Sequence, residues 1–234
     1  MDVALAFGSR KFTVHVALET RKRLSITVHP DCRVTAKAPI DAPLARVEAG
    51  LRRRSRWIAG QLSYFEKHQP LPQPRQYVGG ETHCYLGRQY RLRIRVGGKA
   101  RVRLVGRFFE MELPDPRDRE KARSLMLAWF GAHSREILES RLAKHMPDFL
   151  KRGAPIPRVR YRRMAKRWGS CSPKGVVTLN TELGKAPLHC IDYVVVHELC
   201  HLLHPHHDQK FYRLLSRTLP DWEKRKERLE EVPI

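Results

Sequence analysis

The stretch that decides the fold is Tyr193-Val-Val-Val-His-Glu-Leu-Cys-His-Leu-Leu-His-Pro-His-His207. Because an α-helix advances by ~3.6 residues per turn, His197 and His201 lie on one face and can direct two imidazoles at one metal ion. Glu198 follows the first histidine and is placed to act as a general base toward a water on that ion. Apolar residues at near-helical spacing predict a helix over roughly 187–204, which Pro205 then ends.

Three downstream histidines compete for the place of third ligand, namely His204, His206 and His207. His204 is nearly on the face of His197 but lies ~10 Å further along the helix axis. Zinc–nitrogen bonds are only ~2.0–2.1 Å long, so one straight helix cannot bring all three histidines to one ion. The third ligand therefore follows Pro205, and spacing alone does not separate His206 from His207.

The chain resembles the YgjP-like metallopeptidase-domain family in three stretches. They are residues 193–207 followed by Phe211, then Arg167-Trp-Gly-Ser-Cys-Ser172 with Leu179-Asn180, and more weakly residues 85–92. In that family the third ligand is the histidine six residues after the second, followed four residues later by an aromatic. The resemblance thus implies that His207 completes the site and that the catalytic part is zincin-like.

The segment from Arg167 to Ser172 has two interpretations. A strand beside a metal site can pair with an extended peptide, and Gly169 would let another backbone approach closely. Alternatively, Trp168 fills the core and the serines satisfy backbone groups. The resemblance favours a segment that lines the active cleft. The residues expected to line it are Arg167, Trp168, Gly169, Ser170, Cys171, Asn180 and Tyr193.

Motif chemistry and resemblance together indicate a zinc-dependent hydrolase of the metallopeptidase type. We expect one Zn²⁺ per chain on His197, His201 and His207 as neutral imidazoles, with the fourth position open for water. Glu198 is the expected general base. The oxyanion donor is Tyr193, Arg167 or a backbone amide, and the sequence does not rank them.

Two other functions stay open from the sequence. The same site could hydrolyse a nucleotide phosphoanhydride, although the sequence has no Walker-type loop and no carboxylate cluster suited to magnesium. The chain could instead be a nucleic-acid-binding module with a structural metal. Glu198 and the missing fourth protein ligand argue against that alternative.

Composition sets the outer bounds. No run of the 234 residues approaches the ~18 apolar residues of a membrane span. The five cysteines are widely spaced and odd in number, which indicates reduced thiols rather than a disulfide framework. The first residues lack the pattern of a signal peptide, so a cytoplasmic protein is expected.

The formal charge is +22, and residues 1–110 carry 22 Lys/Arg against 8 Asp/Glu, a net of +14. Such an excess indicates a polyanionic partner such as nucleic acid or nucleotide, or else a solvated basic surface. Arginines alternate with apolar residues in the predicted strands near 91–104, and antiparallel pairing would gather them on one face. They are Arg91, Arg93, Arg95, Arg101 and Arg103.

The pattern of elements predicts an α+β protein: a β-rich N-terminal region, 1–113, and a second region, 114–234, with the strongest family match at 155–220. The first region should contain strands within 1–40, a helix capped by Asp41, a stiff linker at 69–74 and a β-meander at 77–113. The second should contain a long helix from Asp115-Pro116 to Pro147, then a zincin-like part with a small sheet and the metal-binding helix.

Overall fold

The computed structural model describes residues 1–67, 69 and 75–232. The chain forms two compact units, Met1–Gln73 and Pro74–Ile234. The division therefore falls after residue 73 and not after 113 as expected. The physical reason is that the sheet formed by residues 82–113 shares its core with the long helix that follows it, including Met126. Residues 70–74 of the predicted linker lie outside the described residues.

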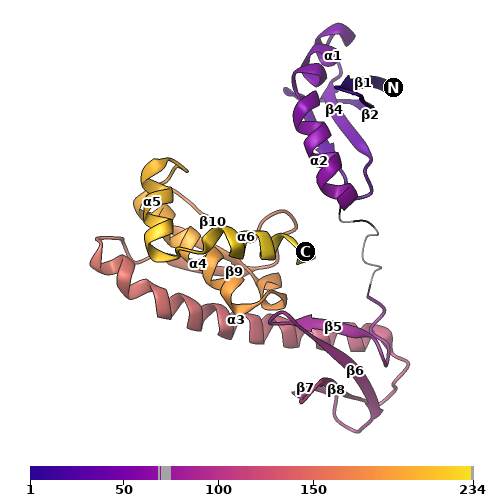
Figure 1. Ribbon diagram of the computed structural model, residues 1–234. Coiled ribbons are helices and arrows are strands. Elements are labelled where there is room, and N and C mark those ends of the chain that lie inside the picture. The colour runs from indigo at the N-terminus through magenta and orange to yellow at the C-terminus, as the bar shows by residue number, and fades with distance from the viewer. Residues whose placement is uncertain (68, 70–74, 233–234) are drawn as a thin grey trace. The chain divides into compact units, whose positions relative to one another are not determined.

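The N-terminal unit is a four-stranded sheet with two helices (Figure 1). The strands are β1 (Asp2–Phe7), β2 (Arg10–Glu19), β3 (Ser25–Val28) and β4 (Val34–Pro39), in the order β1-β2-β4-β3. Alternate residues such as Val14, Val16 and Val34 are buried against the helices, as period-two strands require. Strand β1 was not anticipated.

The helix expected after Asp41 is two helices, α1 (Leu44–Arg53) and α2 (Ser55–Lys67), which meet at Arg54. Pro43 occupies the N-cap position and no side chain caps α1, so the predicted capping by Asp41 is wrong. Val47, Leu51, Ile58 and Leu62 are buried on the sheet side of the two helices. Within each helix the two residues are four positions apart, which places them on one face and leaves the opposite face to solvent.

The C-terminal unit begins with a second four-stranded sheet. Its strands are β5 (Thr82–Tyr85), β6 (Arg88–Val96), β7 (Arg101–Val105) and β8 (Phe108–Leu113), in the order β5-β6-β8-β7. Strand β8 lies between β6 and β7 and is parallel to β6, so the sheet is not the simple meander that was expected. The reason is apolar burial. Leu92, Phe109 and Met111 face the helix that follows and form the core of this sheet.

This strand order changes the setting of the arginines. Arg93 and Arg103 both pair across Glu110 of β8, and Arg95 and Arg101 pair across Glu112. Arg101 donates two hydrogen bonds to Glu112, of 2.8 and 2.7 Å. The five arginines do share one face, but acidic neighbours lie between them and offset much of their repulsion.

Helix α3 (Arg119–Lys151) is 33 residues long and supports the rest of the unit (Figure 1). Asp118, not Asp115, caps it by accepting a hydrogen bond from the amide of Lys121 at 2.9 Å. The helix was expected to end at Pro147 but continues through it. The missing proline amide removes one helical hydrogen bond, and the full burial of Phe149 in the core offsets that loss.

The remainder contains a small sheet and three more α-helices. Strands β9 (Arg158–Arg162), β10 (Gly169–Cys171) and β11 (Val176–Asn180) have the order β10-β11-β9, and η1 (Thr181–Lys185) follows. Helices α4 (Leu188–Leu203), α5 (Gln209–Thr218) and α6 (Trp222–Glu230) complete the chain. The structure confirms an α+β fold. Among the described residues, no helix combines the length and apolar character needed to cross a membrane.

Candidate metal centre

The first two histidines are positioned by the most deeply buried helix of the unit. Ten of the 16 residues of α4 are buried, among them Val194, Val195 and Leu199. This packing against α3 and the small sheet fixes the rotation of the helix. His197 and His201 consequently lie on the side that faces the following turn, as the spacing of four residues predicts.

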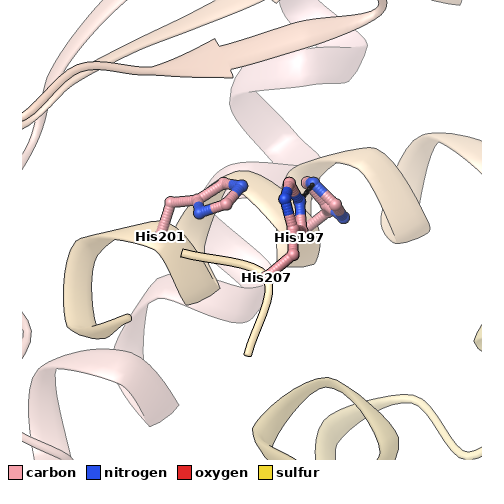
Figure 2. Close-up of side chains that lie close together, drawn as sticks. All are labelled: His197, His201 and His207. Atoms are coloured by element: carbon pink, nitrogen blue, oxygen red, sulfur yellow. Dashed lines mark hydrogen bonds between the residues drawn. The ribbon is translucent and has the colours of Figure 1, made fainter. Parts of the chain in front are cut away.

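The third histidine comes from the turn that follows α4. The helix ends at Leu203, and His204 adopts an extended conformation with φ −132° and ψ 93°. The chain then reverses, and His207 returns to the two helical histidines (Figure 2). One nitrogen of each of His197, His201 and His207 lies within 4.8 Å of the other two. Neither His204 nor His206 belongs to this group, so of the two candidates that spacing left open only His207 lies with the helical histidines.

The donor atoms fit a single small cation. Nε2 of His197 and Nε2 of His207 are 3.0 Å apart. Two zinc–nitrogen bonds of ~2.0–2.1 Å at a tetrahedral angle separate their nitrogens by about 3.3 Å. Nδ1 of His201 lies 3.2 Å from the carbonyl oxygen of His204, and that oxygen can only accept. Nδ1 therefore carries the proton, and Nε2 of His201 is left with a free lone pair for a metal.

Electrostatics also favour neutral, ligating imidazoles. Burial, and then the neighbouring His201 and His207, lower the pKa of His197 to about 3. Burial likewise lowers the pKa of His201. Three protonated imidazoles held this close would repel one another, so the neutral forms are favoured. Neutral imidazoles keep the nitrogen lone pairs that a metal ion needs.

The ring of Phe211 packs against all three histidines. Its ring centroid lies 5.0 Å from that of His197 and 4.7 Å from those of His201 and His207, and the residue is fully buried. Asp208 holds it there, because this N-cap side chain of α5 accepts a hydrogen bond from the Phe211 amide at 2.9 Å. This cap ties the start of α5 to the geometry of the site.

Glu198 directly follows His197 in α4, and its side chain is buried. It is 5% exposed, and its Oε2 has no hydrogen-bond partner in the described part of the chain. Burial raises the pKa of Glu198 to about 8, and the positive charge of Arg167 partly opposes this rise. A bound cation would further favour the carboxylate form, because opposite charge stabilises it. Within the described residues, Oε2 is thus a buried acceptor whose hydrogen-bonding capacity is not used.

Gly169 of β10 packs directly against this carboxylate. A Cβ built on Gly169 would lie 2.4 Å from Oε1 of Glu198 and 2.7 Å from its Cγ. Only a residue without a side chain lets the strand approach so closely. The absence of a side chain at Gly169 therefore makes room for the side chain of Glu198, whereas the expectation was the close approach of another backbone.

Asn180 has a structural role and does not line the site. It is fully buried, and its Nδ2 donates to the carbonyls of Met164 at 2.7 Å and Arg167 at 2.9 Å. Its Oδ1 accepts from the amides of Met164 and Glu182. Three of these bonds hold the loop that leads into β10 and the fourth caps η1, so all its hydrogen-bonding capacity is used, which corrects the expectation that Asn180 lines the cleft.

The other residues expected to line the cleft differ in how deeply they are buried. Trp168 is partly buried and packs against the main core, as in the interpretation that it fills the core. Tyr193 is 8% exposed, and the centroid of its ring lies 5.7 Å from that of His197. Arg167 is exposed, and Ser170 is half-buried in β10. Cys171 is close enough to Glu198 for burial and that charge to raise the pKa of its thiol to about 11.

Comparison with protein families adds the decisive observation. The YgjP-like metallopeptidase domain matches residues 22–232, which is most of the chain and includes the histidine turn, Glu198 and β10. The chain belongs to this family. No curated protein matches it. Membership makes this YgjP-like protein a metallopeptidase-type hydrolase whose family implies a bound metal ion.

Sequence reasoning missed one buried ionic group in this YgjP-like domain. Asp192 of α4 accepts two hydrogen bonds of 2.6 Å from Arg141 and lies 3.0 Å from Nε2 of His145. A charged residue one step before the apolar run from Tyr193 to Val196 is the signal that would have revealed it. An aspartate in that place must have a buried partner.

Proposed function

We propose that the protein is a zinc-dependent peptidase, with one Zn²⁺ held by His197, His201 and His207 and with Glu198 as general base. The observation that carries the proposal is the group of three imidazole nitrogens within 4.8 Å of one another, beside a buried carboxylate with a free oxygen. Three nitrogen ligands and an open fourth position are typical of catalytic zinc, whereas structural zinc sites have four protein ligands.

In this proposal the metal supplies Lewis acidity and brings the pKa of a water toward ~7. Glu198 accepts the proton of the attacking water and donates it to the leaving amine, so its charge is restored in each turnover. Phe211 keeps the three rings in place, and the carbonyl of His204 keeps the His201 tautomer that can ligate. Tyr193, whose ring lies 5.7 Å from that of His197, and Arg167, whose charge acts on Glu198, are the candidate donors to the oxyanion in this proposal.

Strand β10 is the feature that favours a peptide as substrate. The amide of Asn180 donates to the carbonyl of Trp168, and the amide of Ser172 donates to the carbonyl of Val176. Trp168 and Ser172 are therefore at hydrogen-bonded positions opposite the β11 strand. Pairs alternate along antiparallel strands, so the backbone groups of Gly169 and Cys171 point away from β11. Within the described residues β10 is an edge strand, and an extended peptide added there would pass beside Glu198.

The test compares wild type with Glu198→Gln. Metal analysis of the purified wild type should give one zinc per chain, and unstructured casein-like peptides should be cleaved in a zinc-dependent way. Glu198→Gln should keep its zinc and its fold while turnover falls about 10²–10⁴-fold. Metal loss in this variant would place Glu198 among the ligands and contradict the proposed mechanism. Hydrolysis of nucleoside triphosphates in place of peptides would favour the phosphoanhydride reaction.

A further inference from the structure

The junction of α1 and α2 carries a run of arginines that acidic residues scarcely offset. Arg52, Arg53, Arg54 and Arg56 surround the point where the two helices meet, and all four are exposed. Arg52 has an ion partner, Glu48 at 3.4 Å. Within the described residues, the side chains of Arg53, Arg54 and Arg56 form no ion pair and no hydrogen bond. The charge of these three is therefore available to a partner.

A second basic run reaches the same end of the unit. Lys22 and Arg23 are exposed in the connection between β2 and β3, and Leu24 follows them. A methyl of Leu24 lies 2.8 Å from the position that a Cβ on Gly50 would occupy. Gly50 lies about one helical turn before Arg53 on the same side of α1, and Arg54 follows as the C-cap residue. The Leu24–Gly50 contact thus brings the two basic runs together, although about 30 residues separate them in the sequence.

An exposed tryptophan borders these charges. Trp57 lies in the first turn of α2, four residues after Arg53, and is 44% exposed. In this turn the neighbouring Ile58 and Ala59 are the buried residues, so Trp57 is not part of the core. A flat aromatic among unpaired arginines is the combination on which single-stranded nucleic acids stack while their phosphates are neutralised.

The arginine face of the second sheet lacks these features. Glu110 and Glu112 lie among its five arginines, and Arg93 covers the ring of Phe108 with its Cζ 3.1 Å from the centroid. Its charge is partly offset and its aromatic ring is covered. The two basic surfaces therefore differ in what they offer to a polyanion.

We infer that Lys22, Arg23, Arg53, Arg54, Arg56 and Trp57, here called the junction patch, form a binding site for single-stranded nucleic acid. The arginines and the lysine contact phosphates, and Trp57 stacks on a base. The patch lies wholly in the N-terminal unit and shares no residue with the histidine group, so it adds a recognition function that does not depend on the proposed hydrolysis.

The test measures binding of the full chain to a fluorescent single-stranded oligonucleotide, to the matching duplex and to anionic phosphatidylserine vesicles. Replacing Arg53, Arg54 and Arg56 together by Gln should weaken single-strand binding at least about tenfold and lower the log–log salt slope by about two, at ~0.7 per phosphate. The same three arginines replaced by Lys should keep most of the affinity. Trp57→Ala should weaken single-strand binding at least about fivefold, and Trp57→Phe should restore much of it.

The charge-matched control replaces Arg91, Arg95 and Arg103 on the sheet by Gln. This control should change the affinity by less than about threefold, and none of these variants should lose zinc. An equal loss in the control, or no effect of Trp57→Ala, would overturn the assignment to the junction patch. Undetectable single-strand binding at low salt, or binding to vesicles or duplex in preference to the single strand, would overturn the inference as a whole.

Discussion

At the scale of single residues, Gly169 limits what the site tolerates. Gly169→Ala should place a methyl 2.4 Å from Oε1 of Glu198, so the carboxylate or the strand must move. A displacement of about 1 Å at a catalytic group can cost on the order of 10²-fold in rate. We expect a loss of that size in peptidase kcat, measured under saturating substrate, with zinc content unchanged.

The matched control is Gly131→Ala in α3, where a new Cβ would meet nothing within 4 Å. This control should keep its activity and gain about 0.5–1 kcal/mol in helix stability. Full activity of Gly169→Ala would show that Glu198 can work from another position.

The choice among the downstream histidines is also decided at single residues. His207→Ala should weaken zinc binding by at least about 100-fold, because losing a ligand should cost more than losing an outer-shell partner. His206→Ala and His204→Ala should change zinc affinity little, since neither ring belongs to the nitrogen group. Competition with a chromophoric chelator measures all three. A large effect of His206→Ala without one of His207→Ala would reverse the assignment.

At the scale of elements, Asp192 joins three helices. It accepts from Arg141 of α3, lies near His145 of the same helix, and is 3.9 Å from Arg225 of α6. Burial by itself would raise its pKa, but the hydrogen bonds from His145 and Arg141 outweigh this and hold the pKa of Asp192 well below 3.8. The fold therefore depends on a charged carboxylate within its core.

This dependence predicts how stability changes with pH. Because the folded-state pKa is depressed, the stabilisation is complete above the ordinary value and is lost as pH falls below about 3.8. Asp192→Asn should cost on the order of 3 kcal/mol at neutral pH, since Arg141 is left without its partner. Urea unfolding followed across pH 2–7 should show the difference between wild type and variant shrinking toward acid. A constant difference would mean that the charge of Asp192 does not contribute.

At the scale of the whole molecule, the two units have separate cores and separate proposed sites. The three histidines and Glu198 lie in the C-terminal unit, as does the hydrophobic cluster that packs around α4 and Phe211. A chain of residues 75–234 should therefore bind zinc within about twofold of the full-length affinity. It should also lose the proposed binding of single-stranded oligonucleotides. Loss of zinc from this shorter chain would show that the N-terminal unit contributes to the metal centre.

The sequence by itself determined the features that depend on local spacing. Residues four apart on an apolar helix must share a face, which gave His197 and His201. The alternation of apolar and polar residues likewise predicted most of the strands. Spacing also showed that the third ligand follows Pro205, and family resemblance, not geometry, selected His207.

Tertiary structure decided what depends on contacts between distant residues. Strand β8 lies between two arginine-rich strands because Phe109 and Met111 must be buried against α3, and α3 passes Pro147 because Phe149 is needed in the core. Asn180 holds a loop that precedes it by 13–16 residues, and Leu24 brings two basic runs together at Gly50. None of these contacts has a sequence period, because close packing depends on which surfaces meet and not on how far apart their residues are along the chain.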